Sequence, residues 1–309
     1  MSKYNDNKSD NFMEPTVSQH GSHMVMTNVH KPMKTKYVNL DTIFADEYNL
    51  NNTADYNITL PEKITNVQSV SISNIDLPMS FYNISSDLGN NVFRLTYGAN
   101  EYICEVPSNQ YIIIADFITA INTVIRSTIQ VNTITIFSLI NNKVSISNAT
   151  TFLMKITFDV NTLGTDRYNF KSKLGWLLGF RKLSYTMEAP SSGQTTVIEA
   201  ECNYNINTIR YMYLVIDEFS RGNQNTFISP LPSSLINKNI IAKLSLNSVS
   251  YPFNSIIPLN RFTGLMSDQR CYSGKIDLQK LNIKLINEYG KTINLNGNHF
   301  SFCMEINYE

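Results

Sequence analysis

The residues of this sequence that could carry chemistry are few and scattered. His299 is the one histidine outside the first 36 residues, so a Ser-His-Asp or Cys-His site would have to be built on it. No GxSxG nucleophile elbow, no metal-ligand spacing such as HxH or HExxH and no glycine-rich phosphate loop is present. Asp217 and Glu218 are adjacent on a predicted strand, so their carboxylates point to opposite faces and cannot act as a pair. The sequence therefore predicts no catalytic, cofactor-binding or metal-ligating residue, and a protein that is not an enzyme.

Basic residues gather around one short predicted helix, at Lys171, Lys173, Arg181 and Lys182. Nucleic-acid binding would need such residues interleaved with aromatic side chains. The alternatives are a solvated helix face and an anchor for the carboxylates of a neighbouring protein. We favour these alternatives and expect no nucleic-acid partner, because 25 basic and 25 acidic residues cancel and leave no long-range field.

The chain of 309 residues is poor in charge. Charged residues make up 16% of it, compared with about 25% in an average soluble domain. A surface low in charge repels its neighbours less, which suits a protein packed against others. An AT-rich coding sequence would enrich asparagine, isoleucine and tyrosine in the same way, so the composition leaves both explanations open.

The four cysteines, Cys104, Cys202, Cys271 and Cys303, are widely spaced. This spacing predicts reduced, buried thiols rather than a disulfide framework or a zinc site. The N-terminus lacks an apolar signal region, and no run of about 18 apolar residues occurs. We therefore expect no membrane span.

The elements that would position any site are predicted to be strands. The run from Phe300 to Tyr308 alternates apolar and polar residues with period two, as does the run from Leu281 to Ile286. A turn at 288–291 leads from the second of these into a short run over 292–295, and Asn296-Gly297 favours a tight hairpin turn between that short run and the last one. The sequence thus predicts a terminal two-faced meander that a second sheet must cover.

Upstream, residues 1–36 have no periodicity and predict a disordered arm. Strands are expected over 56–60, 67–77, 92–97, 101–106, 134–140, 143–147, 152–160, 195–203, 209–219 and 239–247, with a β-bulge at Ser73-Asn74. A helix is expected after Ser108 as its cap, and a second, short one over 170–178 that Gly179 ends. Burial of both faces of 209–219 marks a central strand, and long loops are expected over 220–238 and between 247 and the terminal meander.

Many short strands and few helices predict a mainly β fold, a jelly-roll-like antiparallel β-sandwich over 37–309. The segment at about 91–190, which carries both helices, is longer than a plain jelly roll needs. We interpret it as an α+β insertion.

Several stretches together form a familiar set: KYVNLDTIF, ITLPEKITNVQSVSISNIDLPMSFYNIS with GNNVFRL, VPSNQYIIIADFITAIN, KLGWLLGFRK and the ending LQKLNIKLINEYGKTINLNGNHFSFCMEINYE. The set resembles minor-capsid or penton-type virion proteins of nucleocytoplasmic large DNA viruses, and virophage pentons are the neighbouring alternative. The resemblance implies a non-enzymatic building block of an icosahedral shell. It would be located in the virion, be assembled in the host cytoplasm, and associate with itself or with a major capsid protein, without a cofactor or small-molecule ligand.

Two other hypotheses stay open. The first is a glycan- or receptor-binding β-sandwich of a virion spike, for which 220–234 is the candidate loop. The second is a hydrolase on a jelly-roll scaffold, which would depend on His299.

Overall fold

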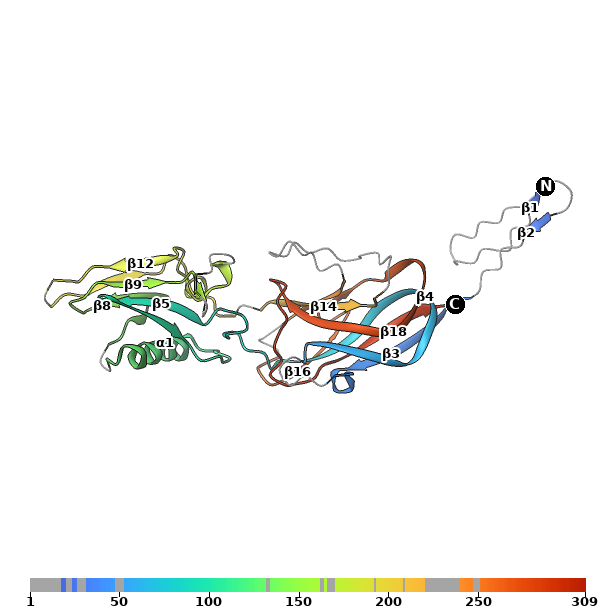
Figure 1. Ribbon diagram of the computed structural model, residues 1–309, viewed down its shortest axis with the longest axis horizontal. Coiled ribbons are helices and arrows are strands. Elements are labelled where there is room, and N and C mark those ends of the chain that lie inside the picture. Colours follow the sequence, from blue (N-terminus) through green and yellow to red (C-terminus); the bar gives the residue numbers. More distant parts are fainter. Residues whose placement is uncertain are drawn as a thin grey trace.

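The computed structural model of the protein describes residues 18–20, 24–26, 32–47, 53–131, 134–161, 164–165, 170–191, 193–207, 209–219, 239–246 and 251–309. Two lobes lie end to end along the long axis of the molecule (Figure 1). The large lobe has a hydrophobic core drawn from residues 40–81 and 212–306. The small lobe has a separate core drawn from residues 84–206, which include the whole segment 91–190.

The large lobe is built from one eight-stranded antiparallel sheet. Its strands are β3 (Lys34–Asp41), β4 (Asp55–Pro78), β14 (Tyr211–Asp217), β15 (Ile240–Ser245), β16 (Ile256–Asn260), β17 (Leu265–Ser267), β18 (Arg270–Asn287) and β19 (Ser301–Tyr308). Their order is β17-β15-β14-β18-β4-β19-β3, and β16 pairs with β4. A short 3-10 helix, η1 (Thr42–Phe44), follows β3. The expected mainly antiparallel β class is therefore confirmed.

The sheet curls far enough for its end strand β17 to approach β4, which lies four places along the strand order. Strand β17, at one end of the order, pairs with β15 and also lies against the middle of β4. Ser267 makes the link, because its Oγ accepts from the amide of Ile72 at 3.2 Å and donates to the carbonyl of Ile241 at 3.2 Å. One curled sheet thus encloses the core on two sides, as a sandwich does.

The strand neighbours differ from the predicted meander. Strands β18 and β19 do not pair with each other, because β4 lies between them. The 24-residue β4 also joins two predicted strands into one. The long loop expected before the terminal strands contains β16, β17 and the start of β18, and Pro258 lies within β16, opposite Asp76. Strand neighbours and register depend on which residues distant in the sequence are buried together, and local sequence patterns do not contain that information.

Several local predictions are confirmed. The pairing of β4 with β19 shifts register between Asn74 and Ile72, which places the bulge at Ser73. Pro78 is the last residue of β4. Asn296 and Gly297 both have positive φ, at 52° and 77°. Strand β14 lies between β15 and β18, and its residues 212–216 are buried on both faces.

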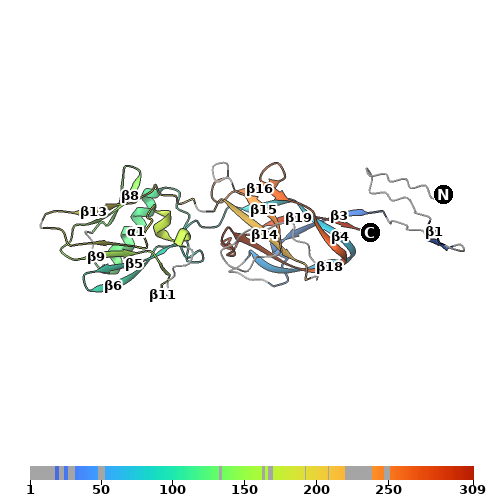
Figure 2. The ribbon, with the colours of Figure 1, turned by 90° about the horizontal axis from the view of Figure 1, so that it is seen from above.

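The small lobe combines two sheets with one long helix. The four-stranded sheet has the order β12-β9-β5-β6 and the three-stranded sheet the order β13-β8-β7. Their strands are β5 (Val92–Tyr97), β6 (Asn100–Glu105), β7 (Phe137–Ile140), β8 (Lys143–Asn148), β9 (Met154–Thr157), β12 (Ser184–Met187) and β13 (Thr196–Glu199), and β10 (Val160–Asn161) pairs with β11 (Gly164–Thr165). Helix α1 (Ile114–Ile129) covers the lobe from one side (Figures 1 and 2).

The first helix begins later than predicted, and the second helical stretch begins at Phe170 as predicted. Ile113 is the N-cap of α1 and makes no side-chain capping bond, so Ser108 is not the cap. The Ser108 hydroxyl instead accepts from the amide of Ser86 at 3.1 Å. The second helical stretch consists of η2 (Phe170–Ser172) and α2 (Leu174–Leu177), and Gly179 follows it with φ of 97°, as predicted.

Two crossing segments and a few side chains join the lobes. The buried amide of Asn83 donates to the carbonyls of Tyr111 and Ile206, at 2.8 and 3.0 Å, and so binds both crossing segments together. From the large lobe, Lys291 Nζ donates to Leu88 O at 3.0 Å. The Lys291 bond holds the large lobe against the turn that precedes β5.

Near the N-terminus, β1 (Ser18–His20) pairs with β2 (Met24–Met26). These short strands lie within the stretch 1–36 for which disorder is expected, and β3 begins at Lys34. The other residues of that stretch, apart from 32–33, lie outside the described residues.

Candidate functional site

His299 contacts the hydroxyl of a threonine in η1. Its Nδ1 lies 3.0 Å from Thr42 Oγ1, and the same hydroxyl accepts from the amide of Phe300 at 3.0 Å. This contact ties η1 to the residue that precedes β19. Among the described residues, no acidic side chain hydrogen-bonds to His299, and no group of three or more His, Cys, Asp and Glu side chains could hold a metal ion.

Asp217 and Glu218 have separate environments. Asp217 Oδ1 accepts from the amide of Phe219 at 2.9 Å. Glu218 is buried and forms an ion pair with Arg270, whose side chain is also fully buried. The hydroxyl of Tyr272 donates to the same carboxylate oxygen at 2.7 Å. Burial beside Glu218 raises the pKa of Tyr272 above its usual range. The network links the end of β14 to the start of β18.

The thiols are partly as predicted. All four cysteines are free, but Cys104 alone is buried and Cys271 is exposed. Burial raises the pKa of the Cys104 thiol to about 11. The expectation of buried thiols is therefore correct for Cys104 and wrong for Cys271.

The basic residues around α2 are divided among different environments. Lys173 is buried, and its Nζ donates to Gly89 O at 3.3 Å. Lys182 is exposed. Lys171 and Arg181 line a cavity, which two basic residues of the large lobe, Arg210 and Lys291, also line. Two of the four basic residues noted in the sequence at 171–182 therefore line this cavity, together with two basic residues from distant parts of the chain.

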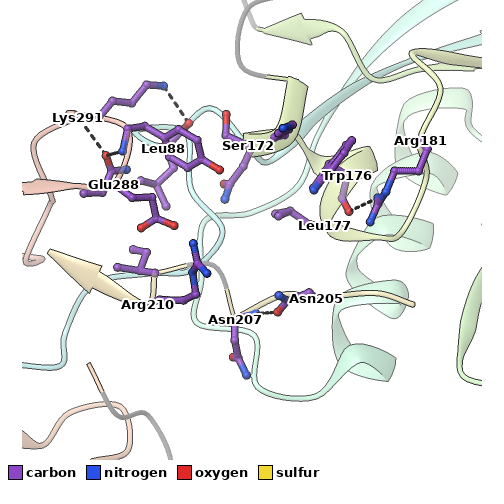
Figure 3. Close-up of a pocket in the computed structure, with 15 residues that line it drawn as sticks. Leu88, Ser172, Trp176, Leu177, Arg181, Asn205, Asn207, Arg210, Glu288 and Lys291 are labelled. Atoms are coloured by element: carbon purple, nitrogen blue, oxygen red, sulfur yellow. Dashed lines mark hydrogen bonds between the residues drawn. The ribbon is translucent and has the colours of Figure 1, made fainter. Parts of the chain in front are cut away.

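We call this cavity the junction pocket, since both lobes line it (Figure 3). Its volume is about 270 Å³. The small-lobe wall comes from η2, α2 and the stretch up to Asn207, and it includes Trp176 and Leu177. The large-lobe wall comes from Ile209 and the turn after β18.

The junction pocket is electropositive. Its lining contains four basic side chains, Lys171, Arg181, Arg210 and Lys291, and one acidic side chain, Glu288. Burial raises the pKa of Glu288 above its usual range, and this effect outweighs the opposing attraction of Arg210. The low-dielectric wall that raises this pKa also strengthens the field of the surrounding cations.

The side chain of Arg181 is fixed by an aromatic ring and by backbone carbonyls. Its guanidinium lies 3.9 Å from the ring of Trp176, a cation–π distance. Its Nη1 donates to the carbonyls of Trp176 and Phe180, both at 3.0 Å. Its backbone amide donates to Tyr185 Oη at 3.0 Å and to Glu201 at 3.1 Å. The charge therefore has a fixed position beside the only tryptophan of the chain.

A second candidate surface is the turn between β16 and β17, which we call the tip loop (Arg261–Gly264). Phe262 in this loop is 97% exposed. The loop is nevertheless well fixed, because Asn260 Oδ1 accepts from the amides of Phe262 and Thr263 at 2.8 and 3.2 Å. Thr263 Oγ1 donates to Pro258 O at 2.9 Å, so a fixed turn holds an aromatic ring in solvent.

The candidate glycan-binding loop at 220–234 lies outside the described residues. Within the described residues, no helix has the length and apolar character needed to cross a membrane. Neither Arg210, Lys291 nor Phe262 was singled out from the sequence. Asn260 and Gly264 around the tip loop are turn-forming residues and could have indicated its position.

No model of a known protein family matches this sequence, and no curated protein matches it. Among solved structures, the fold is similar to a chain of the Sputnik virophage structure determined by cryo-EM, with a TM-score of 0.41, 13% sequence identity, and coverage of 90% of this chain and 98% of that chain. It is also similar to the mavirus penton protein, with a TM-score of 0.43, 8% identity, and coverage of 88% of this chain and 99% of that chain.

Proposed function

We propose that this protein is a non-enzymatic structural protein of an icosahedral virus particle, a minor-capsid or penton-type building block. It acts through protein–protein contacts with other copies of itself or with a major capsid protein, and its location is the virion. The resemblance of the sequence supplies the class of assembly. The small lobe, in this proposal, is an inserted domain that presents additional contact surface.

The tip loop is the observation that supports a contact function. Keeping a phenylalanine in water forgoes about 1.5–3 kcal/mol of burial free energy, so its exposure on a fixed turn calls for a reason. Aromatic anchors of this kind dominate the binding energy of protein interfaces. Because the loop is already ordered by Asn260 and Thr263, docking of Phe262 loses little conformational entropy.

The rest of the large lobe suits the same role. Eight strands curled around one core form a stiff body, and contacts at its loops are repeated by symmetry in a closed shell. Two more large apolar side chains are exposed on the strands that flank the tip loop, Ile256 on β16 and Met266 on β17, at 65% and 63%. Each adds exposed apolar surface that a neighbour could cover.

The test compares Phe262→Ser with the neighbouring variant Arg261→Ser. Size-exclusion chromatography with light scattering should show oligomers for the native chain and for Arg261→Ser, and a shift toward monomer for Phe262→Ser. Circular dichroism confirms that each variant is folded. Imaging of purified particles should locate the protein in the shell. A strictly monomeric native protein that is absent from particles would overturn the proposal.

A further inference from the structure

We propose that the junction pocket is a binding site for carboxylate groups. This inference goes beyond the proposed function, because a shell protein does not need a charged pocket between its lobes. It also departs from the expectation that the protein has no small-molecule ligand. The pocket binds either an acidic segment of a neighbouring protein, a source that depends on the proposed function, or a free small carboxylate, which does not.

The charge of the lining carries the first step. Four basic side chains and one acidic side chain, Glu288, line one cavity of about 270 Å³, so the lining carries excess positive charge in a chain whose overall charge is zero. Like charges that share a partly enclosed site repel one another, which is unfavourable unless an anion is present. A ligand carboxylate would satisfy the donors of Lys171 and Arg210, whose charged groups make no ion pair with any described residue.

The arrangement of donors carries the second step. Guanidinium groups bind carboxylates with two parallel hydrogen bonds. In Arg181 the Nη1 atom is used by backbone carbonyls, which fixes the group and leaves its other nitrogens for a ligand. Figure 3 shows that Arg181 and Arg210 belong to opposite lobes, with Trp176 and Leu177 between them. The two guanidinium groups would therefore bind different carboxylates of one ligand, and the apolar side chains between them lower the local dielectric and strengthen each ion pair.

The position of the pocket carries the third step. Its walls belong to both lobes, so a ligand with several carboxylates would join Arg210 of the large lobe to Lys171 and Arg181 of the small lobe. The bond between Lys291 and Leu88 already links the two walls. A ligand that contacts both walls stabilises the arrangement in which they face each other. Binding should therefore also reduce motion between the lobes.

Trp176 provides a direct measurement, because it is the only tryptophan of the chain and lines the pocket. The probes are citrate, a blocked tetra-glutamate peptide and, as the neutral comparison, a blocked tetra-glutamine peptide. Each is titrated into the full-length protein while the fluorescence of Trp176 is recorded. We expect saturable changes with citrate or the glutamate peptide and none with the glutamine peptide.

The variants separate the pocket from general attraction to positive charge. Arg210→Gln and Lys171→Gln should each weaken binding about tenfold or more, as expected for loss of a charged hydrogen bond. Lys182→Gln is the matched control, since it removes one exposed positive charge beside Arg181 but lies outside the lining. It should change the affinity by less than about twofold. Glu288→Gln removes the one negative charge of the lining and should tighten binding.

The outcomes are distinct. Tighter binding of the glutamate peptide than of citrate assigns the pocket to an acidic protein segment, and the reverse order assigns it to a free carboxylate. No response of Trp176 to either probe at millimolar concentration overturns the inference, as does an equal loss of affinity in Arg210→Gln and Lys182→Gln. The oligomeric state of the same samples is measured by light scattering, so failure of the pocket and failure of the assembly proposal are seen separately.

Discussion

Removal of Arg270 should be among the most damaging single changes in the large lobe. Its fully buried guanidinium binds the Glu218 carboxylate, the carbonyl of Ile216 at 2.9 Å and the carbonyl of Asn239 at 2.8 Å. These partners end β14 and precede β15, while Arg270 itself begins β18. Arg270→Met keeps most of the side-chain volume but removes every one of these donors.

The expected loss of folding free energy comes from the Glu218 carboxylate, which stays buried after its arginine partner is removed. Breaking a buried ion pair by removal of one partner costs about 3–5 kcal/mol, because the other charge stays buried without compensation. Domain stability is only about 5–15 kcal/mol, so the loss is a large fraction of it. Adding Glu218→Leu to Arg270→Met removes the stranded charge. The double variant should therefore be more stable than Arg270→Met alone, by about 1–2 kcal/mol.

Urea unfolding followed by far-ultraviolet circular dichroism is the suitable assay. Tryptophan fluorescence is not, because Trp176 lies in the small lobe and the ion pair lies in the large one. Midpoints and slopes for the native chain, both single variants and the double variant form a mutant cycle. The control is Arg261→Met, which removes an exposed arginine in the tip loop and should change stability by about 0.5 kcal/mol at most.

Two results would refute this reasoning. One is a cost below about 1 kcal/mol for Arg270→Met, which would mean that water or rearrangement compensates Glu218. The other is a double variant whose cost equals the sum of the two single costs, since independent sites add and coupled sites do not.

The remaining predictions concern the small lobe and the thiols. Gly175→Ala should destabilise the small lobe by about 1–3 kcal/mol, because its added Cβ would lie 2.4 Å from the ring of Phe158. In Trp176-monitored unfolding, Gly274→Ala, which meets no atom within 4 Å, should match the native chain, and an equal loss in both variants would contradict the packing argument. A thiol reagent at neutral pH should modify exposed Cys271 quickly and Cys104 only after unfolding, and labelling of Cys104 at the rate of Cys271 would show that it is not buried. Because burial raises the pKa of Cys104 from 9.0 to about 11, the folded chain retains this proton longer than the unfolded chain. Its contribution to stability is complete below pH 9.0 and is lost as pH rises through about 11; Cys104→Ala should remove that part of the pH dependence.

Local features were predictable because they depend on short-range sterics. The positive φ values at Asn296 and Gly297, and at Gly179 after α2, follow from residue types that tolerate the left-handed region. The bulge at Ser73 was visible as a slip in the alternation of apolar residues. The cap predicted at Ser108 is wrong for the opposite reason, because its hydroxyl has a tertiary partner, the amide of Ser86, that no local rule contains.

The candidate site could be predicted only in part. Lys171 and Arg181 stand out as a basic group in the sequence, but Arg210 and Lys291 are isolated charges there. Lys291 lies 110 residues or more after Lys171 and Arg181. The buried pair of Arg270 and Glu218 carries no sequence signal of pairing. A long-range contact forms where it completes burial and hydrogen bonding in the whole fold, and no local window holds that information.

The sequence by itself determined that this chain would be mainly antiparallel β, where most strands and turns would lie, and that no familiar catalytic or metal motif is present. Side-chain periodicity and turn chemistry act over a few residues, so they can be observed directly in the chain. Only the tertiary structure decided that β4 separates β18 from β19, that Ser267 closes the curled sheet, and that four distant cations share one pocket. Those outcomes depend on which surfaces are buried together, and this is determined by packing of the complete core rather than by the sequence of any single strand.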